Sequence, residues 1–248
     1  MEKYSARFLE ESRHMFIYDE NNGRQEFIKQ LESEFPIKTG ENSPMAIYMK
    51  DLYLPKIEKT EDIDKIKVAI LTRDYFEYSI AREIVKKIYE QIDLSLLNDR
   101  INNILIWFGR ENSSSINKLE ALKILLQGLE ESVNFYSEAY SELVKTGDFI
   151  SDMSIPIPYI NVEGFTRTVQ NLLNNQSHFG IIIDQQDNLS IELQRAINWL
   201  VGKRINGRLS IKVFTKEQDW KTYYDLNGTF IEAVHDYEVI KINSLNKF

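Results

Sequence analysis

The chain has 248 residues, of which 43% are hydrophobic and 27% are charged, and these values are typical of a globular protein. This length allows one large domain or two small ones, with a substantial core. The net charge of −8 argues against a protein that holds nucleic acid by bulk electrostatics, and the absence of cysteine excludes disulfides and thiolate metal sites.

The sequence also lacks the usual signals for membranes and secretion. It contains no apolar run of about 18 residues, so we expect no membrane-spanning helix. No apolar segment follows the basic residues of Met1–Arg7, so we expect no secretory signal. Together these features predict a cytoplasmic protein without a membrane partner.

The first part of the chain is predicted to form a strand, a turn, a helix and a second strand. The apolar run His14–Tyr18 has the length of a short strand, and Asn21–Gly23 follows it as a turn. The next segment has helical periodicity and ends before Pro36. The second strand is expected between Pro44 and Pro55, where a segment rich in apolar residues is bounded by two prolines.

The middle of the chain, from about Arg73 to Lys145, is predicted to be helical. Helical faces recur around Ile80–Ile92 and then around Ile101–Phe108. A third helix, for which Ser113–Ser115 supplies a cap candidate, has apolar spacings of three and four. Its seam consists of Leu119, Leu122, Leu126, Leu129, Val133, Tyr136, Tyr140 and Leu143. We expect this seam to pack on the two preceding helices, and the alternative is a coiled coil with another molecule.

After Gly147, strands and helices alternate again. Helices are predicted over Val162–Leu173 and from Asn188 to about Arg204. Strands are predicted over His178–Ile183 and Leu209–Thr215, and the segments Thr229–Val234 and Tyr237–Ile242 are expected to give one or two further strands. This alternation predicts an α/β fold with a mainly parallel, doubly wound sheet. We expect residues 1–60 and 150–248 to form this core, with residues 61–149 as a large helical insertion.

The segment Phe16–Ile28 lies between a strand and a helix, as does the phosphate-binding P-loop, G-x-x-x-x-G-K-[ST]. In a P-loop, backbone N–H groups surround the phosphates, the lysine neutralises charge and the hydroxyl binds magnesium. In one register, Asp19 stands at the first glycine and Arg24 at the second. In the register that we prefer, Gly23 is the second glycine, Arg24 replaces the lysine and Gln25 replaces the hydroxyl residue. The alternative is a plain strand-to-helix turn.

A second segment has the pattern of a Walker B strand, in which apolar residues precede Asp and usually Glu. Ile181–Asp184 fits the first part of this pattern, and Gln185 stands at the position of Glu. An amide cannot accept a proton from water, so the general base is missing. The strand that ends at Thr215 falls where a sensor strand with a terminal polar residue would lie.

Together these segments resemble the core of the origin-recognition-like ATPases of the AAA+ class. The resemblance covers about residues 10–60 and 155–245, and its runs are Ile183–Ser190, Gln194–Leu200, Ser210–Val213 and Ile231–Glu238. It implies a P-loop core that binds ATP, often within an oligomer or on DNA. The positions that match nucleotide-site residues are Gly23, Arg24, Gln25, Asp184, Gln185 and Thr215.

Three departures from the family pattern determine which family properties we expect in this protein. The P-loop and the Walker B glutamate are replaced, the segment between the two motifs is longer, and no helical lid or winged-helix domain follows the last strand. We therefore expect the family's fold and a vestigial nucleotide site, with no catalytic residue, no metal and no cofactor.

Our first hypothesis is a catalytically inactive AAA+-like subunit, a pseudo-ATPase, that acts through protein–protein contacts of its helical insertion. The expected setting is a bacterial multi-protein assembly in a mobile-element or antiviral defence system. The expected partner is an active ATPase or a second copy of the chain, with nucleic acid involved only indirectly. The alternatives are an ATP-binding switch with slow or no hydrolysis, and an unrelated α/β enzyme.

Overall fold

The structure is a computed structural model. It describes residues 14–19, 24–37, 44–49, 52–57, 63–93, 97, 117–148, 160–174, 178–184, 189–203, 209–233 and 235–242.

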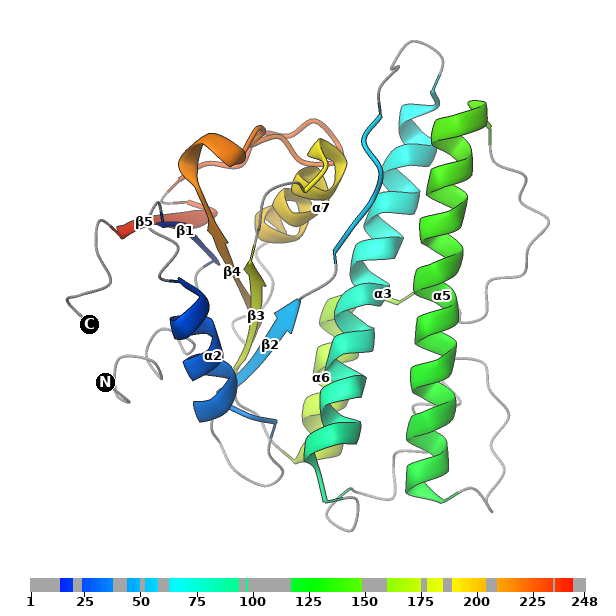
Figure 1. Cartoon of the computed structure of the whole chain (residues 1–248), viewed down its shortest axis with the longest axis vertical. Coiled ribbons are helices and arrows are strands. Elements are labelled where there is room, and N and C mark those ends of the chain that lie inside the picture. Colours follow the sequence, from blue (N-terminus) through cyan, green and yellow to red (C-terminus); the bar gives the residue numbers. More distant parts are fainter. Residues whose placement is uncertain are drawn as a thin grey trace.

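One parallel sheet organises the fold (Figure 1). Its strands are β1 (His14–Asp19), β2 (Met45–Met49), β3 (Phe179–Asp184), β4 (Leu209–Thr215) and β5 (Tyr237–Ile242). They lie in the order β2-β3-β4-β1-β5, and each neighbouring pair is parallel. The described helices are α2 (Arg24–Glu34), α3 (Lys65–Gln91), α5 (Lys118–Thr146), α6 (Val162–Leu173) and α7 (Ile191–Gly202), and a short 3-10 helix, η2, spans Glu217–Asp219. The predicted α/β class with a parallel sheet is confirmed.

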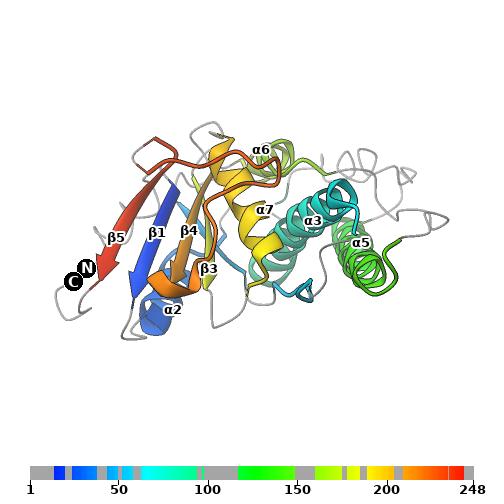
Figure 2. The ribbon, with the colours of Figure 1, turned by 90° about the horizontal axis from the view of Figure 1, so that it is seen from above.

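The two faces of the sheet carry unequal layers (Figure 2). On one face, Met15 and Ile17 of β1 pack with Ile28 and Leu31 of α2. On the other face, Phe16 belongs to a larger core to which α3, α5, α6 and α7 all contribute. Successive residues of a strand point to opposite faces, so β1 can serve both cores only because its residues are apolar at consecutive positions.

Helices α3 and α5 pack along their length as an antiparallel pair, and α3 also contacts α7, α6 and β2. The predicted seam of α5 is the buried face of this pair, so intramolecular packing is confirmed. Leu129, Tyr140 and Leu143 are buried, whereas Leu119 in the first turn is 37% exposed. Hydrophobic burial, rather than helix propensity, therefore holds the pair together.

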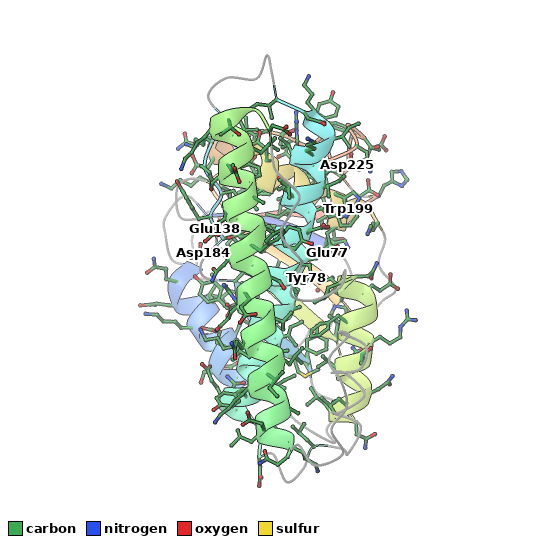
Figure 3. The ribbon with its side chains drawn as sticks, turned by 90° about the vertical axis from the view of Figure 1, so that its right-hand side faces the viewer. Glu77, Tyr78, Glu138, Asp184, Trp199 and Asp225 are labelled. Carbon is green, nitrogen blue, oxygen red and sulfur yellow. The ribbon has the colours of Figure 1, made fainter. Side chains whose placement is uncertain are left out.

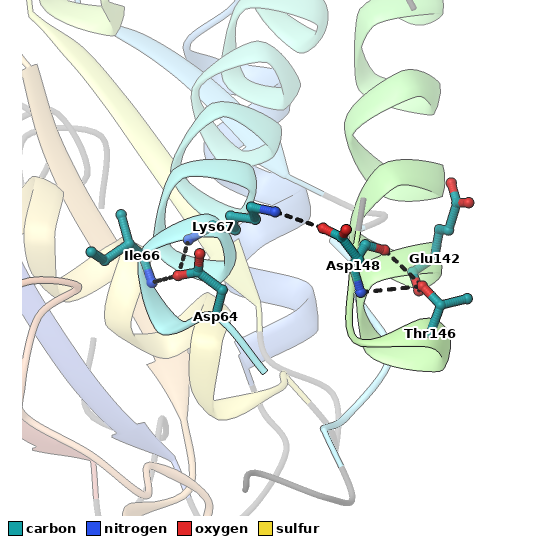
Figure 4. A network of polar contacts seen from close by, with 6 residues as sticks. All are labelled: Asp64, Ile66, Lys67, Glu142, Thr146 and Asp148. Carbon is teal, nitrogen blue, oxygen red and sulfur yellow. Dashed lines mark hydrogen bonds and ion pairs between the residues drawn. The ribbon is translucent and has the colours of Figure 1, made fainter. Parts of the chain in front are cut away.

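Polar contacts join the beginning of α3 to the end of α5 (Figure 4). Asp64 caps α3 by accepting hydrogen bonds from the backbone N–H groups of Ile66 and Lys67. The ammonium group of Lys67 lies 2.6 Å from a carboxylate oxygen of Asp148, beyond the end of α5. Both charged side chains are largely exposed, so this ion pair aligns the two helices more than it stabilises them.

Several predicted elements differ from the structure or lie outside the described residues. The helix expected over Ile101–Phe108 and the cap candidate Ser113–Ser115 lie outside the described residues. The cap of α5 is instead Asn117, whose side-chain oxygen accepts the N–H of Glu120 at 2.8 Å. Strand β2 is shorter than predicted, since it ends at Met49.

Of the one or two strands expected over Thr229–Val234 and Tyr237–Ile242, the second is β5, whereas the first segment forms no strand in its described residues. Of its described residues, Phe230 and Ala233 form single bridges, with Tyr224 and Tyr237 respectively. The reason is a tight turn before Phe230, in which the N–H of Gly228 bonds the carbonyl of Asp225. The segment thus folds back locally before it can join the sheet.

None of the helices within the described ranges is both long enough and apolar enough to cross a lipid bilayer.

Histidine 14 is buried at the amino end of β1. Its Nδ1 accepts a hydrogen bond from the backbone N–H of Ile211 at 3.0 Å, which requires a neutral ring. Burial, together with the nearby charges of Lys212 and His178 and against the opposing charge of Asp236, lowers the pKa of His14 to about 4. Protonation of His14 therefore opposes folding.

A pair of leucines in the α5 seam tests the packing. We expect Leu129→Ala to lower the free energy of unfolding by about 3 kcal/mol, because it leaves a cavity between α5 and α3. Leu119→Ala, in the same seam but partly exposed, should cost less than about 1 kcal/mol. Urea unfolding followed by circular dichroism measures both changes. Equal losses would show that the seam does not pack as described.

The state of His14 predicts an acid-sensitive stability. Its pKa is about 4 in the folded protein and 6.5 when unfolded. The unfolded chain therefore binds more protons between these values, and stability falls as the pH drops through this window. We expect wild type to lose about 2 kcal/mol from this residue between pH 7 and pH 5.

His14→Gln should remove that part of the pH dependence, whereas His235→Gln, at an exposed histidine, should keep it. Urea unfolding at pH 7 and pH 5 measures the difference. The same pH dependence in wild type and His14→Gln would contradict the assignment.

Candidate functional site

The connections of the sheet mark one edge as the place for a ligand. From β1 the chain continues through α2 to β2, which is the strand at one edge of the sheet. From β4 it passes β1 to reach β5, which is the strand at the opposite edge. The direction of the connections thus reverses between β1 and β4. In open parallel sheets, ligands bind at such a switch point, beyond the carboxyl ends of the strands.

The strand register brings the predicted motifs to this edge. Tyr18 near the end of β1 pairs with Thr215 at the end of β4, and Asp184 at the end of β3 pairs with Phe214. Only β4 lies between β1 and β3, so the ends of β1 and β3 are about 10 Å apart. The structure therefore brings Asp184, Thr215 and the end of β1 together.

The carboxylate of Asp184 lies on the face of the sheet that α2 covers. Its neighbour in register, Phe214, and the preceding same-face residue, Ile182, both belong to the core beneath α2. Asp184 is half-buried, and its Oδ2 accepts a hydrogen bond from the hydroxyl of Tyr48 at 3.2 Å. This tyrosine, near the end of β2, therefore orients the carboxylate.

Thr215 projects to the opposite face, because side chains alternate along β4. It is fully buried, and its hydroxyl donates to the carbonyl oxygen of Lys216 at 3.1 Å. The carboxylate of Asp184 and the hydroxyl of Thr215 therefore lie on different sides of the sheet. They do not converge on one ligand atom.

Tyrosines occupy the space beside the end of β1 on the Thr215 face. The hydroxyl of Tyr18 forms a hydrogen bond with the hydroxyl of Tyr223. Burial raises the pKa of Tyr18, and the hydrogen bond to Tyr223 raises it further, so the phenol stays neutral. The ring of Tyr223 stacks on Tyr237 at 5.9 Å between centroids, which fixes this aromatic group against the sheet.

The remaining predicted positions lie at the start of α2 and after β3. Gly23 and Gln185 lie outside the described residues. Arg24 is the first residue of α2, although its side chain is not described, and Gln25 follows it with an exposed side chain. Helix α2 begins five residues after β1 ends, so its amino end, with the positive end of the helix dipole, lies at the same edge.

These groups are a poor match to a magnesium–triphosphate site. Magnesium needs oxygen ligands in an octahedral arrangement, shared with the phosphates. The edge supplies the carboxylate of Asp184, while the hydroxyl of Thr215 faces away from it, and Gln25 carries an amide at the position of the P-loop hydroxyl. Among the described residues, no group of three or more His, Asp or Glu side chains could hold a metal ion.

Sequence reasoning missed Tyr18, Tyr48 and Tyr223. Tyr18 and Tyr48 carry hydroxyl groups near the ends of strands. Their location near strand ends is a signal in the sequence that they lie near Asp184 or Thr215. Tyr223 carries no such signal, because its segment has no regular periodicity. The assignment of Gly23, Arg24, Gln25, Asp184, Gln185 and Thr215 to a nucleotide site stays a prediction.

Comparison with known proteins gives one match. The family model described as ORC-CDC6-like matches residues 45–247, which include Asp184, Gln185 and Thr215 but begin after β1 and α2. No curated protein and no solved structure matches the chain. The match spans most of the sequence, and the parallel sheet agrees with the P-loop architecture of AAA+ proteins. The chain therefore belongs to the ORC-CDC6-like family and is an AAA+ ATPase-like protein.

Proposed function

We propose that this protein is a pseudo-ATPase, an AAA+-like subunit that does not hydrolyse ATP and acts through protein–protein contacts in a multi-protein assembly. The observation that carries the proposal is the arrangement of side chains at the carboxyl ends of the strands. The ends of β1, β3 and β4 meet there, and the carboxylate of Asp184 and the hydroxyl of Thr215 lie on opposite faces of the sheet. The bacterial setting and the role in mobile-element or antiviral systems stay predictions from the resemblance alone.

The chemistry supports a loss of turnover. ATP hydrolysis requires charge neutralisation at the phosphates, a positioned metal and an activated water. Gln25 and Gln185 place amides where a magnesium-binding hydroxyl and a general base are needed. Asp184, at the position of the Walker B aspartate, accepts a hydrogen bond from the hydroxyl of Tyr48. Removal of such electrostatic contacts typically slows phosphoryl transfer by orders of magnitude.

The geometry also suggests where a partner would bind. The seam of α5 is occupied by α3, so only the outward face of α5 is available for an intermolecular contact. That face is exposed and mainly acidic, and it includes Glu130 and Glu131. It also includes Glu138, which is labelled in Figure 3. An acidic face favours a partner with a basic surface, since complementary charge steers association.

Nucleotide titration tests the loss of turnover. We expect no turnover in the presence of Mg²⁺ and ATP, and no saturable binding below about 1 mM, which corresponds to about −4 kcal/mol. Asp184→Asn should behave as wild type in both assays. The control Asp93→Asn changes an exposed aspartate beyond the end of α3.

Two results would change the assignment. Micromolar ATP binding that Asp184→Asn abolishes, without turnover, would favour the ATP-binding switch. The shared edge of Asp184 and the amino end of α2 is the observation in favour of that switch. Turnover on the order of 1 s⁻¹ or faster would refute the pseudo-ATPase.

A charge reversal on α5 tests the partner surface. We expect Glu130→Lys/Glu138→Lys to reduce the amount of a co-purifying subunit by about tenfold or more, because like charges then face each other across the contact. The tagged protein is purified from its own cells, and subunits are quantified by mass spectrometry. Glu217→Lys/Glu232→Lys, at exposed positions between β4 and β5, is the matched control. Equal losses in both variants would place the contact elsewhere.

A further inference from the structure

A cavity lies beside the beginning of α3. Figure 1 shows the beginning of α3 at the top. Its volume is about 430 Å³, which is within the range of small-molecule sites. Three segments line it: the beginning of α3 with the residues before it, the first turns of α7, and the loop 224–228. Neither Asp184 nor Thr215 contributes to it.

The walls of the cavity are mainly apolar. The apolar part of the lining consists of Val68 and Ala69 of α3, Leu226 of the loop, and Ile57 and Ile63 before α3. Tyr224 also lines the cavity and is 51% exposed. Its ring contacts the ring of Phe230, with 5.4 Å between the ring centroids. A flat or branched apolar group would gain free energy by displacing water from these walls.

Two cations lie at this cavity without a counter-ion. Lys65 and Arg195 both line it and are both exposed. Neither forms an ion pair or a hydrogen bond with any residue in the described part of the chain. They come from different helices, α3 and α7, so a single anion between them could contact both.

Of the two carboxylates that line the cavity, Asp225 is engaged by the protein. Asp225 is buried, and its Oδ1 accepts the backbone N–H groups of Asn227 and Thr229 at 2.8 and 2.7 Å (Asp225 is labelled in Figure 3). Glu192 lies close enough to the hydroxyl of Tyr140 that it adds to the effect of burial in raising the pKa of that hydroxyl. With Asp225 engaged, the two cations Lys65 and Arg195 outnumber the remaining carboxylate, Glu192, among the charges that a ligand would meet.

Hydrogen bonds fix all three walls in advance. Asn198 donates from Nδ2 to the carbonyl oxygens of Thr222 and Tyr224, which ties the loop 224–228 to α7. Gly228 has φ of 79°, a conformation that permits the tight turn. Ser190 caps α7 and Asp64 caps α3, so both helices begin at defined positions. A preformed cavity avoids the entropic cost of ordering its walls on binding.

We propose that this cavity binds a small amphipathic anion. The apolar or aromatic body of the ligand would lie between Val68, Leu226 and Tyr224, and its acidic group, a carboxylate, phosphate or sulfonate, would lie between Lys65 and Arg195. This site is independent of the proposed pseudo-ATPase role, because it shares no residue with the nucleotide-site positions.

Two fluorescent probes that differ by one charged group test the proposal. 1-Anilinonaphthalene-8-sulfonate carries a sulfonate, and N-phenyl-1-naphthylamine has the same ring system without it. We expect one binding site per chain and a tighter Kd for the anionic probe. Lys65→Gln/Arg195→Gln should weaken the anionic probe by about tenfold or more and leave the neutral probe unchanged. Ala69→Phe should fill the cavity and weaken both probes.

Lys123→Gln/Lys145→Gln, at two exposed lysines of α5, is the matched charge control and should bind both probes as wild type does. Urea unfolding of each variant shows whether it is folded, since partly folded proteins also bind the anionic probe. Equal Kd values for the two probes in wild type would overturn the proposal. So would an unchanged Kd for the anionic probe in Lys65→Gln/Arg195→Gln.

Discussion

Strand β4 hydrogen-bonds to β1 on one side and to β3 on the other, and this double pairing determines where every other element lies. Every residue of β4 is buried, because helices or connecting segments cover both faces of the sheet at its centre. Parallel strands are stable in such surroundings, since their backbone groups pair fully without water. The double pairing also sets the ends of β1, β4 and β3 side by side, which creates the carboxyl-edge site.

The two faces of the sheet impose different constraints on the protein. The α2 face has a small core and receives Asp184, whereas the opposite face has a large core that continues into the α3–α5 pair. On the face with the larger core, buried side-chain amides hold a neighbouring segment in place by hydrogen bonds. Gln194 and Asn198 of α7 bind the backbone of the 219–224 segment, so a stretch without regular structure is still held in place. That segment supplies Tyr223 to the edge of the sheet and Tyr224 to the cavity near α3.

Membership of the ORC-CDC6-like family rests on residues 45–247, so it says nothing direct about β1 and α2. The topology connects β1 to the matched part of the chain, because β1 lies beside β4 at the point where the connections reverse direction. A protein can therefore keep the fold of an ATPase family and lose its catalytic groups. The order of the strands depends on hydrophobic patterning, which many sequences satisfy, whereas phosphoryl transfer depends on a few groups that must converge within tenths of an ångström.

Local pattern in the sequence was enough to predict β1, β3, β4, β5, α6, α7 and the buried seam of α5, because burial imposes a period of two on strands and of 3.6 on helices. It also placed Asp184 and Thr215 at strand ends. The tertiary structure alone decided the order of the strands and the faces to which these two side chains point. It also brought Tyr48 to Asp184, and Lys65 to the same cavity as Arg195. Such contacts join residues more than a hundred positions apart, and no local period in a sequence records which distant segments share a surface.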